Sequence, residues 1–262
     1  MYRYEKGRFQ PARFEAPREV ELTLVVNGRP ALRLAHSPGE EVELGLGFLW
    51  LGGVFDTLEQ VRWFRRAEGV LEFEVAGRAG PGVPLRTSSC GMGIVYGQRN
   101  VRELPFAALD PELPIRMHAV LRERAVEYRR TRGIHGAALF TVEGRLLHLS
   151  EDIGRHNAVD KIAGRMLLEG WSPPFALAVS GRVSAEMAQK AAAMGAVLLT
   201  SRTGATRSGL ESAERHNLTV CTYVRPLGYR LNTSPGRLLV RAADEVFEAV
   251  RVQEEPGAET GG

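Results

Sequence analysis

Cysteine is scarce in this sequence, and its scarcity excludes several kinds of protein. Only Cys90 and Cys221 occur among the 262 residues. Two cysteines are too few for a disulfide framework, and too few for a structural zinc site made of cysteines. Cys221 lies in the β-like run 218–224, which predicts a buried and unreactive thiol. Cys90 lies in the glycine-rich segment 77–97, which predicts a mobile loop where another molecule can approach the sulfur.

Long apolar runs are also missing. No stretch of about eighteen apolar residues occurs, and the first residues, MYRYEKGRFQ, lack the apolar block of a secretory signal. This predicts a cytoplasmic protein with no membrane partner. Lysine is rare as well, so arginine carries nearly every positive charge, yet the formal net charge of +3 is small for this length. The small net charge argues against a nucleic-acid partner.

The residues that are present predict an N-terminal α+β domain over 1–110. Two alternating runs flank Asn27-Gly28, a pair typical of a tight hairpin turn. Ser37 is the expected cap of a following helix, which should end at Gly52-Gly53. A second hairpin is expected at 61–75, before the glycine-rich segment.

From residue 111 to 252 the pattern predicts an α/β domain, and a disordered tail over 253–262 follows it. A long amphipathic helix over 110–133 and two strands lead into a β-α-β-α-β unit over 175–224. Parallel strands bring the loops after their carboxyl ends to one edge of the sheet. Those loops carry Arg182, Arg202 and Arg225. One such loop is more typical of an ordinary helix cap, but three on one edge predict a bound phosphate or pyrophosphate.

The stretch EDIGRHNAVDKIAG, residues 151–164, is unusually polar for the start of a helix. Asn157 is its expected N-cap, and Gly170 should end the helix. Two interpretations stay open. The polar residues form either the solvated face of a well-capped helix or the wall of a polar pocket.

Together these motifs resemble the formate dehydrogenase accessory sulfurtransferase family, FdhD. The likeness rests on that stretch, on SSCG and TRGIHGAALF before it, and on SGRVSAEMAQKAAAMG, LLTSRTGAT and YVRPLGYRLN after it. It implies a cytidine-deaminase-like C-terminal α/β domain with a smaller N-terminal domain, and a homodimer. In the family, a cysteine takes sulfur from a cysteine desulfurase as a persulfide. It delivers that sulfur to the molybdenum bis(molybdopterin guanine dinucleotide) cofactor, which formate dehydrogenase receives.

The resemblance assigns roles to particular residues. Cys90 occupies the place of the sulfur-carrying cysteine, and His156, Asp160 and Lys161 would organise the cofactor side of the pocket. With that cofactor as ligand, the arginine-bearing edge is the expected place of its guanine nucleotide end, for which GDP is a mimic. The residues concerned are Tyr223, Val224, Arg225, Pro226, Leu227 and Gly228, with Arg182 and Arg202.

The sequence departs from the family pattern CGxCG at Gly93, where a second cysteine would stand. This departure disfavours a cycle through a loop disulfide. A one-cysteine relay survives, because a transferable sulfur needs only one attachment sulfur. A nearby positive charge favours the reactive thiolate, and Arg86 is the candidate for it in this segment.

Two other classes of function are alternatives to a sulfur carrier. A zinc deaminase of this fold needs a glutamate two residues after its histidine ligand and a PCxxC motif, whereas His135-Gly136-Ala137 has no glutamate and the chain has no PCxxC. A chaperone that only holds the cofactor stays open. Replacing Cys90 by alanine separates the two remaining classes, because a chaperone would keep its activity.

Overall fold

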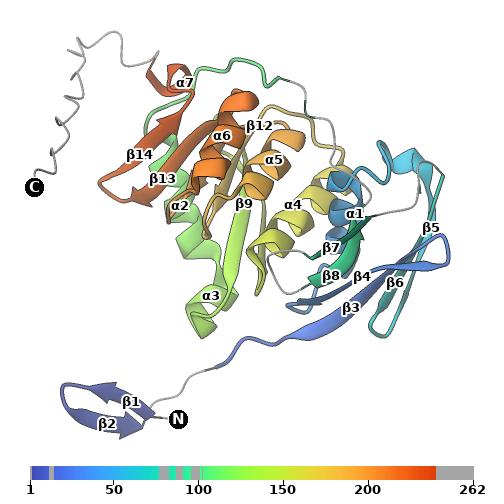
Figure 1. Ribbon diagram of the computed structural model, residues 1–262. Helices are drawn as coiled ribbons and strands as arrows, with labels where there is room; N and C mark the ends of the chain where they lie inside the picture. Colours follow the sequence, from blue (N-terminus) through green and yellow to red (C-terminus); the bar gives the residue numbers. More distant parts are fainter. Residues whose placement is uncertain are drawn as a thin grey trace, which may run out of the picture.

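The computed structural model describes residues 2–11, 15–76, 83–86, 91–95, 101 and 103–239, with the backbone alone for 83–86 and 91–95. Two six-stranded sheets dominate the fold, and the helices α1 and α4 pack against each other between them (Figure 1). Each sheet takes its strands from one part of the chain, before residue 96 or after residue 134. The predicted mixed α and β architecture is therefore confirmed. The predicted tail over 253–262 lies outside the described residues.

The N-terminal sheet has the strand order β5-β6-β3-β4-β8-β7. Its first hairpin turns at Asn27 and Gly28, which both have positive φ (49° and 72°), as the sequence predicted. The prediction of a loop throughout 77–97 is wrong, because two short strands, β7 and β8, lie within it. The strands are β3 (Val20–Val26), β4 (Arg29–His36), β5 (Val61–Ala67), β6 (Val70–Val75), β7 (Val83–Arg86) and β8 (Gly91–Val95).

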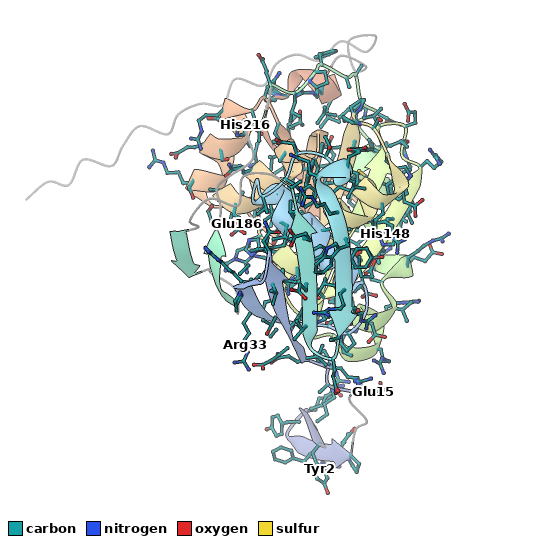
Figure 2. All side chains as sticks on the ribbon, turned by 90° about the vertical axis from the view of Figure 1, so that its right-hand side faces the viewer. Tyr2, Glu15, Arg33, His148, Glu186 and His216 are labelled. Carbon is teal, nitrogen blue, oxygen red and sulfur yellow. The ribbon has the colours of Figure 1, made fainter. Side chains whose placement is uncertain are left out.

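A separate hairpin, β1 (Tyr2–Glu5) with β2 (Arg8–Pro11), precedes this sheet. It projects away from the rest of the chain, and Figure 2 labels its first residue, Tyr2. This hairpin was not predicted from the sequence.

The C-terminal sheet has the order β10-β9-β11-β12-β13-β14, and its strands β11, β12 and β13 run parallel as predicted. The helices α4, α5 and α6 cover one face of it and α2 covers the other (Figure 1). The strands are β9 (His135–Thr141), β10 (Leu146–Asp152), β11 (Phe175–Val179), β12 (Ala196–Ser201), β13 (Thr219–Arg225) and β14 (Gly228–Thr233). The helices are α4 (Arg155–Glu169), α5 (Ala185–Ala193), α6 (Arg207–Arg215) and a short α7 (Gly236–Leu239).

The long helix predicted over 110–133 is in fact two helices, α2 (Leu113–Arg124) and α3 (Val126–Thr131). The chain leaves the helical conformation at Ala125, where ψ is 91°. The carboxylate of Glu151 accepts hydrogen bonds from the backbone N–H groups of Glu127 and Tyr128, at 2.9 and 2.7 Å. A side chain from β10 therefore caps the start of α3, and this makes the break stable.

Two predicted helix caps are also wrong. The helix α1 (Glu41–Leu51) begins after Glu40, which has φ of 56°, and Ser37 instead bonds to residues before α4. The cap position of α4 is Gly154, while Asn157 lies in the first turn and donates to the carbonyl of Ala35 and to Asp152. The predicted ends of both helices, at Gly52 and Gly170, are confirmed.

The two halves meet where α1 crosses α4 at very short range. A Cβ atom on Gly47 would lie 1.8 Å from the backbone oxygen of Asp160, and one on Gly164 would lie 1.9 Å from that of Glu43. Only glycine fits at either position, because the obstacle is backbone and not a movable side chain. One hydrophobic core runs through this crossing into both sheets.

Candidate functional site

A cavity of about 340 Å³ lies between α2, α3 and the edge of the C-terminal sheet where β11, β12 and β13 end. Its volume falls at the lower end of the range for small-molecule sites. Among the described residues that line it are four arginines and two histidines but no carboxylate. Leu121, Ala125 and Ile134 give it an apolar wall. The lining suits an anion with an apolar or aromatic part.

All three predicted loops reach this cavity, but only two of their three arginines line it. Arg202 and Arg225 both line it, and the Arg225 guanidinium donates to the Arg202 carbonyl at 2.6 Å. Ser180, at the end of β11, lines it as well, and its Oγ accepts from the Gly136 N–H at 3.0 Å. Arg182 is exposed and belongs to neither this cavity nor the smaller one beside it. The prediction that parallel strands would gather these loops is confirmed for two arginines.

The predicted segment 223–228 is divided between the cavity and the open surface. Val224 is buried and lines, with Pro226, a smaller cavity of about 70 Å³ that shares Arg202 and Arg225 with the larger one. Leu227 is fully exposed, and Gly228 begins β14. Tyr223 has φ of 53° and is half-exposed, and the Arg230 guanidinium lies over its ring at 4.6 Å. Tyr223 and Val224 lie in a strand as predicted, and the strand extends one residue further than predicted, to Arg225.

His118, like Arg122 and Arg132, is a cavity residue that was not predicted from the sequence. It lies on α2, lines both cavities and is 6% exposed. Neither ring nitrogen has a hydrogen-bond partner of good geometry among the described residues. Burial lowers the pKa of His118 to about 4, the Thr200 carbonyl opposes this in part, and the positive charges of Arg202 and Arg225 lower it further. Leaving such groups unpaired costs about 1–3 kcal/mol each, so the arrangement calls for an explanation.

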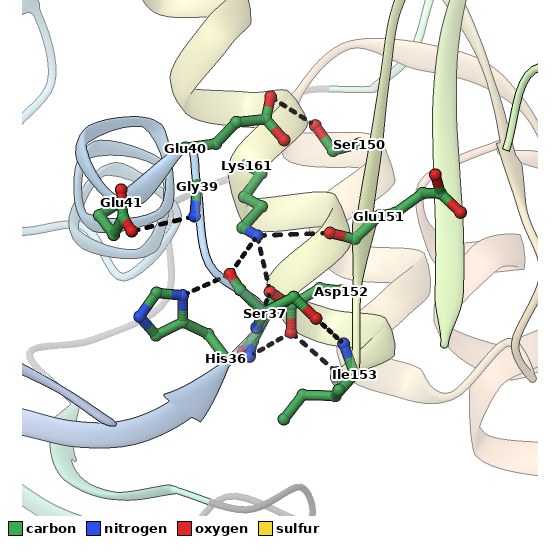
Figure 3. A network of polar contacts seen from close by, with 12 residues as sticks. His36, Ser37, Gly39, Glu40, Glu41, Ser150, Glu151, Asp152, Ile153 and Lys161 are labelled. Carbon is green, nitrogen blue, oxygen red and sulfur yellow. Dashed lines mark hydrogen bonds and ion pairs between the residues drawn. The ribbon is translucent and has the colours of Figure 1, made fainter. Parts of the chain in front are cut away.

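The polar stretch 151–164 is neither a solvated face nor the wall of this cavity. Lys161 is 1% exposed, and its amine lies 2.8 Å from Asp152 Oδ2, with the carbonyls of Ser37 and Glu151 at 3.1 and 3.3 Å (Figure 3). Asp152 also accepts from the Ser37 N–H at 3.0 Å, and Ser37 Oγ accepts from the Ile153 N–H at 3.1 Å. This buried network ties the turn before α1 to the start of α4.

The other two residues predicted from this stretch lie in a second buried cluster, against α5. Both Asp160 oxygens accept from the Lys190 amine, at 2.7 and 2.9 Å. His156 Nε2 lies 3.6 Å from Glu186 and 3.4 Å from Ser184 Oγ. Burial lowers the pKa of His156 to about 4, and the Glu186 carboxylate offsets only part of that shift. The structure therefore groups His156 with Asp160 but separates both from the two cavities.

Glu151 is the residue of the stretch that reaches the cavity, and it does so through α3. Its carboxylate caps that helix, which carries Tyr128 and is followed by Arg132. Both of these residues line the cavity. Glu151 and Glu127 are 24 residues apart in sequence, so no local sequence pattern predicts this contact.

Comparison with known proteins identifies the family. A model of the FdhD/NarQ family matches residues 17–239. The chain belongs to the FdhD/NarQ family. The resemblance found in the sequence is thus confirmed, and every predicted site residue lies within the matched range.

The relatives in this family carry a functional name. The sulfur carrier protein FdhD of Streptomyces avermitilis is 34% identical over 255 aligned positions, and the match covers 87% of this chain and 89% of that protein. The protein of the same name from Shouchella clausii is 32% identical over 260 aligned positions, and the match covers 92% of this chain and 96% of that protein.

A solved structure has the same fold. It is that of a protein from Desulfotalea psychrophila proposed to be a formate dehydrogenase accessory protein. The TM-score is 0.76 at 24% identity, over 91% of this chain and 97% of that one. At that identity the likeness shows the fold alone.

The two cysteines differ in what the structure says of them. Cys221 is fully buried in β13, and burial raises the pKa of its thiol, as the prediction of an unreactive cysteine requires. Cys90 lies outside the described residues, and so does the Arg86 side chain. The next residue, Gly91, begins β8 and pairs with Leu34 of β4. The backbone of Gly93, at the place of the family's second cysteine, pairs with Leu32.

Two further findings bear on function. Among the described residues, no three His, Cys, Asp or Glu side chains gather closely enough to hold a metal ion. In the same part of the chain, no helix combines the length and the apolar character needed to cross a membrane.

Proposed function

We propose that this chain is a sulfur carrier that takes sulfur from a cysteine desulfurase as a persulfide on Cys90. It delivers the sulfur to the molybdenum bis(molybdopterin guanine dinucleotide) cofactor, which formate dehydrogenase needs for activity. The observation that carries the proposal is the match, over most of both chains, to relatives named sulfur carrier protein FdhD. Cys90 is the only cysteine of the chain besides the buried Cys221.

The first chemical step is a transfer between two sulfur atoms. The Cys90 thiolate attacks the outer sulfur of the donor's persulfide, and the donor's cysteine leaves as a thiolate. One S–S bond forms as another breaks, so no external oxidant is needed. The step requires only one cysteine on this chain, which agrees with glycine at position 93.

The lining of the larger cavity supports the proposed binding of the cofactor. Its two loop arginines and the further Arg122 and Arg132 supply positive charge where a pyrophosphate would bind. The guanine nucleotide end belongs at this edge, near Tyr223 and Pro226. His156 and Asp160 hold α4 against α5, and Lys161 ties α4 to the turn before α1. Their contribution to the cofactor site is proposed to be this support.

Mass spectrometry tests the sulfur step. The protein is incubated with a cysteine desulfurase and cysteine, and the intact chain and its peptides are weighed. We expect a gain of about one sulfur atom, confined to the peptide that contains Cys90. Label on Cys221 instead would reverse the assignment.

Calorimetry with GDP tests the nucleotide site. Arg225→Ala should weaken GDP binding by roughly ten- to a hundredfold, because a charge-assisted contact is worth about 1.5–3 kcal/mol. Arg207→Ala is the matched control, since Arg207 is an exposed arginine on α6 that lines neither cavity. If the parent binds neither GDP nor the cofactor, or if both variants bind equally well, the placement is wrong.

A non-catalytic chaperone for the same cofactor is the alternative, and the arginine-lined cavity would serve it equally. Cys90→Ala separates the two functions. A sulfur carrier loses all formate dehydrogenase activation with this change, whereas a chaperone retains it. A deaminase finds no support in the ligand residues described above.

The proposal includes three further features of the family. The parallel strands β11, β12 and β13, with α5 and α6 as crossovers, support a cytidine-deaminase-like description of the C-terminal domain. We also propose a homodimer and a cytoplasmic location. Sedimentation of the purified chain would test the first of these two, and fractionation of cells the second.

A further inference from the structure

The position of His118 is unusual for a buried histidine. It lies between the larger and the smaller cavity and lines both. Buried ring nitrogens are normally hydrogen-bonded, yet neither nitrogen of His118 has a partner of good geometry among the described residues, although the Thr200 carbonyl is near enough to raise the pKa of the ring. A poorly paired ring at the junction of two cavities is placed to form a hydrogen bond with a ligand that enters them.

The charges around His118 decide what can enter. Arg122 lies one turn further along α2, and Arg202 and Arg225 come from the ends of β12 and β13. Arg132 and His135 line the larger cavity but not the smaller one. The Thr200 carbonyl is a further polar neighbour of the ring. Among the described lining residues no carboxylate balances these groups. Burial, and then the positive charges of Arg202 and Arg225, lower the pKa of the ring, so it is neutral at neutral pH without a ligand. A bound anion would favour the protonated form.

We propose that His118 is an anion contact of this cavity that takes up a proton from solvent when a phosphate binds and then donates a hydrogen bond to it. This inference rests on the proposed nucleotide site. It adds His118 to the residues that contact the ligand, and it adds the uptake of one proton to the binding reaction. The ligand is a pyrophosphate or nucleoside diphosphate group held jointly by Arg202, Arg225 and His118.

A coupling between binding and pH follows. Between the pKa of His118 in the free protein and its higher pKa in the complex, each bound ligand carries a proton with it, so the affinity rises as the pH falls. Above the pKa in the complex the proton is not taken up, and this gain disappears. The phosphate of the ligand also titrates in this range, so only the difference between parent and variant reports on His118.

The test is calorimetric binding of GDP and of inorganic pyrophosphate to the full chain between pH 6 and pH 8. The variants are His118→Gln and His118→Met, and His216→Gln is the matched control, because His216 lies at the end of α6 outside both cavities (Figure 2). We expect both His118 variants to bind about tenfold more weakly than the parent at pH 6 and only about twofold more weakly at pH 8. Runs in buffers of different ionisation enthalpy should show smaller proton uptake by the His118 variants.

The outcomes separate this inference from the proposed function. Binding by the parent that neither His118 variant weakens, or weakens equally at all pH values, overturns the inference and leaves the nucleotide site standing. The same holds if proton uptake is lost in His135→Gln and kept in the His118 variants. If the parent binds neither GDP nor pyrophosphate, the site and the inference are both wrong.

Discussion

Lys161→Met should destabilise the protein strongly without acting on the ligand directly. The amine is 1% exposed and makes one ion pair and two hydrogen bonds to carbonyls, all of which the methionine loses. Asp152 is then left as a buried carboxylate without its cation, and breaking a buried pair in this way costs about 3–5 kcal/mol. Asp152 keeps the N–H donors of Ser37 and Gly154, which places the expected loss near about 3 kcal/mol.

The assay is urea unfolding followed by circular dichroism, with Lys6→Met as the control, because Lys6 lies in the exposed turn between β1 and β2. The midpoint should fall for Lys161→Met at an unchanged slope and stay in place for the control. Asp152→Asn with Lys161→Met should lose less than the sum of the single changes, because the two residues share one interaction. An unchanged midpoint together with weaker GDP binding would refute this reasoning and make Lys161 a direct ligand contact.

Three further predictions concern other parts of the chain. Gly164→Ala should lower the free energy of unfolding, measured in urea, by about 3 kcal/mol or more, because the added methyl group would overlap the Glu43 carbonyl. Gly236→Ala is the control and should be nearly neutral, because a methyl group there meets nothing within 4 Å. Equal unfolding midpoints for the two variants would contradict the close crossing of α1 and α4. The folded protein holds the pKa of His118 at about 4, below the unfolded value of about 6.5, so the unfolded chain binds more protons between these values and stability should fall as the pH drops through that window. His118→Gln should remove up to about 3 kcal/mol of that fall, measured by urea unfolding at pH 4.5 and 7, and an identical slope in both proteins would contradict it. Glu151→Ala should cost about 1–2 kcal/mol through loss of the α3 cap and weaken GDP binding severalfold, and normal binding in calorimetry would show that α3 does not shape the cavity.

Local signals in the sequence predicted the fold well. The Asn27-Gly28 turn requires positive φ at both residues, and few dipeptides allow it, so the hairpin could be read directly. The alternation of apolar strands and amphipathic helices over 175–224 predicted the parallel strands, and with them the meeting of Arg202 and Arg225. These features depend on neighbours close in sequence or on a general rule of chain topology.

The failures have the opposite origin. The break at Ala125 depends on Glu151, which reaches α3 from another strand. The sequence pattern around His118 is that of an amphipathic helix, and only the tertiary structure shows that neither ring nitrogen has a partner of good geometry in the described part of the chain. Lys161 is buried because α1, formed by residues far earlier in the chain, covers α4. A sequence pattern shows which side chains are polar. Whether a polar side chain is buried depends on helices and strands that are distant in sequence.

The buried thiol of Cys221 can serve as an intrinsic probe of unfolding. Its sulfur lies in the middle of β13, flanked by β12 and β14, so an alkylating reagent can reach it only when the sheet opens. In a Cys90→Ala background it would be the sole thiol of the chain. The rate at which it reacts would then measure the opening of the C-terminal sheet under native conditions, with no added probe.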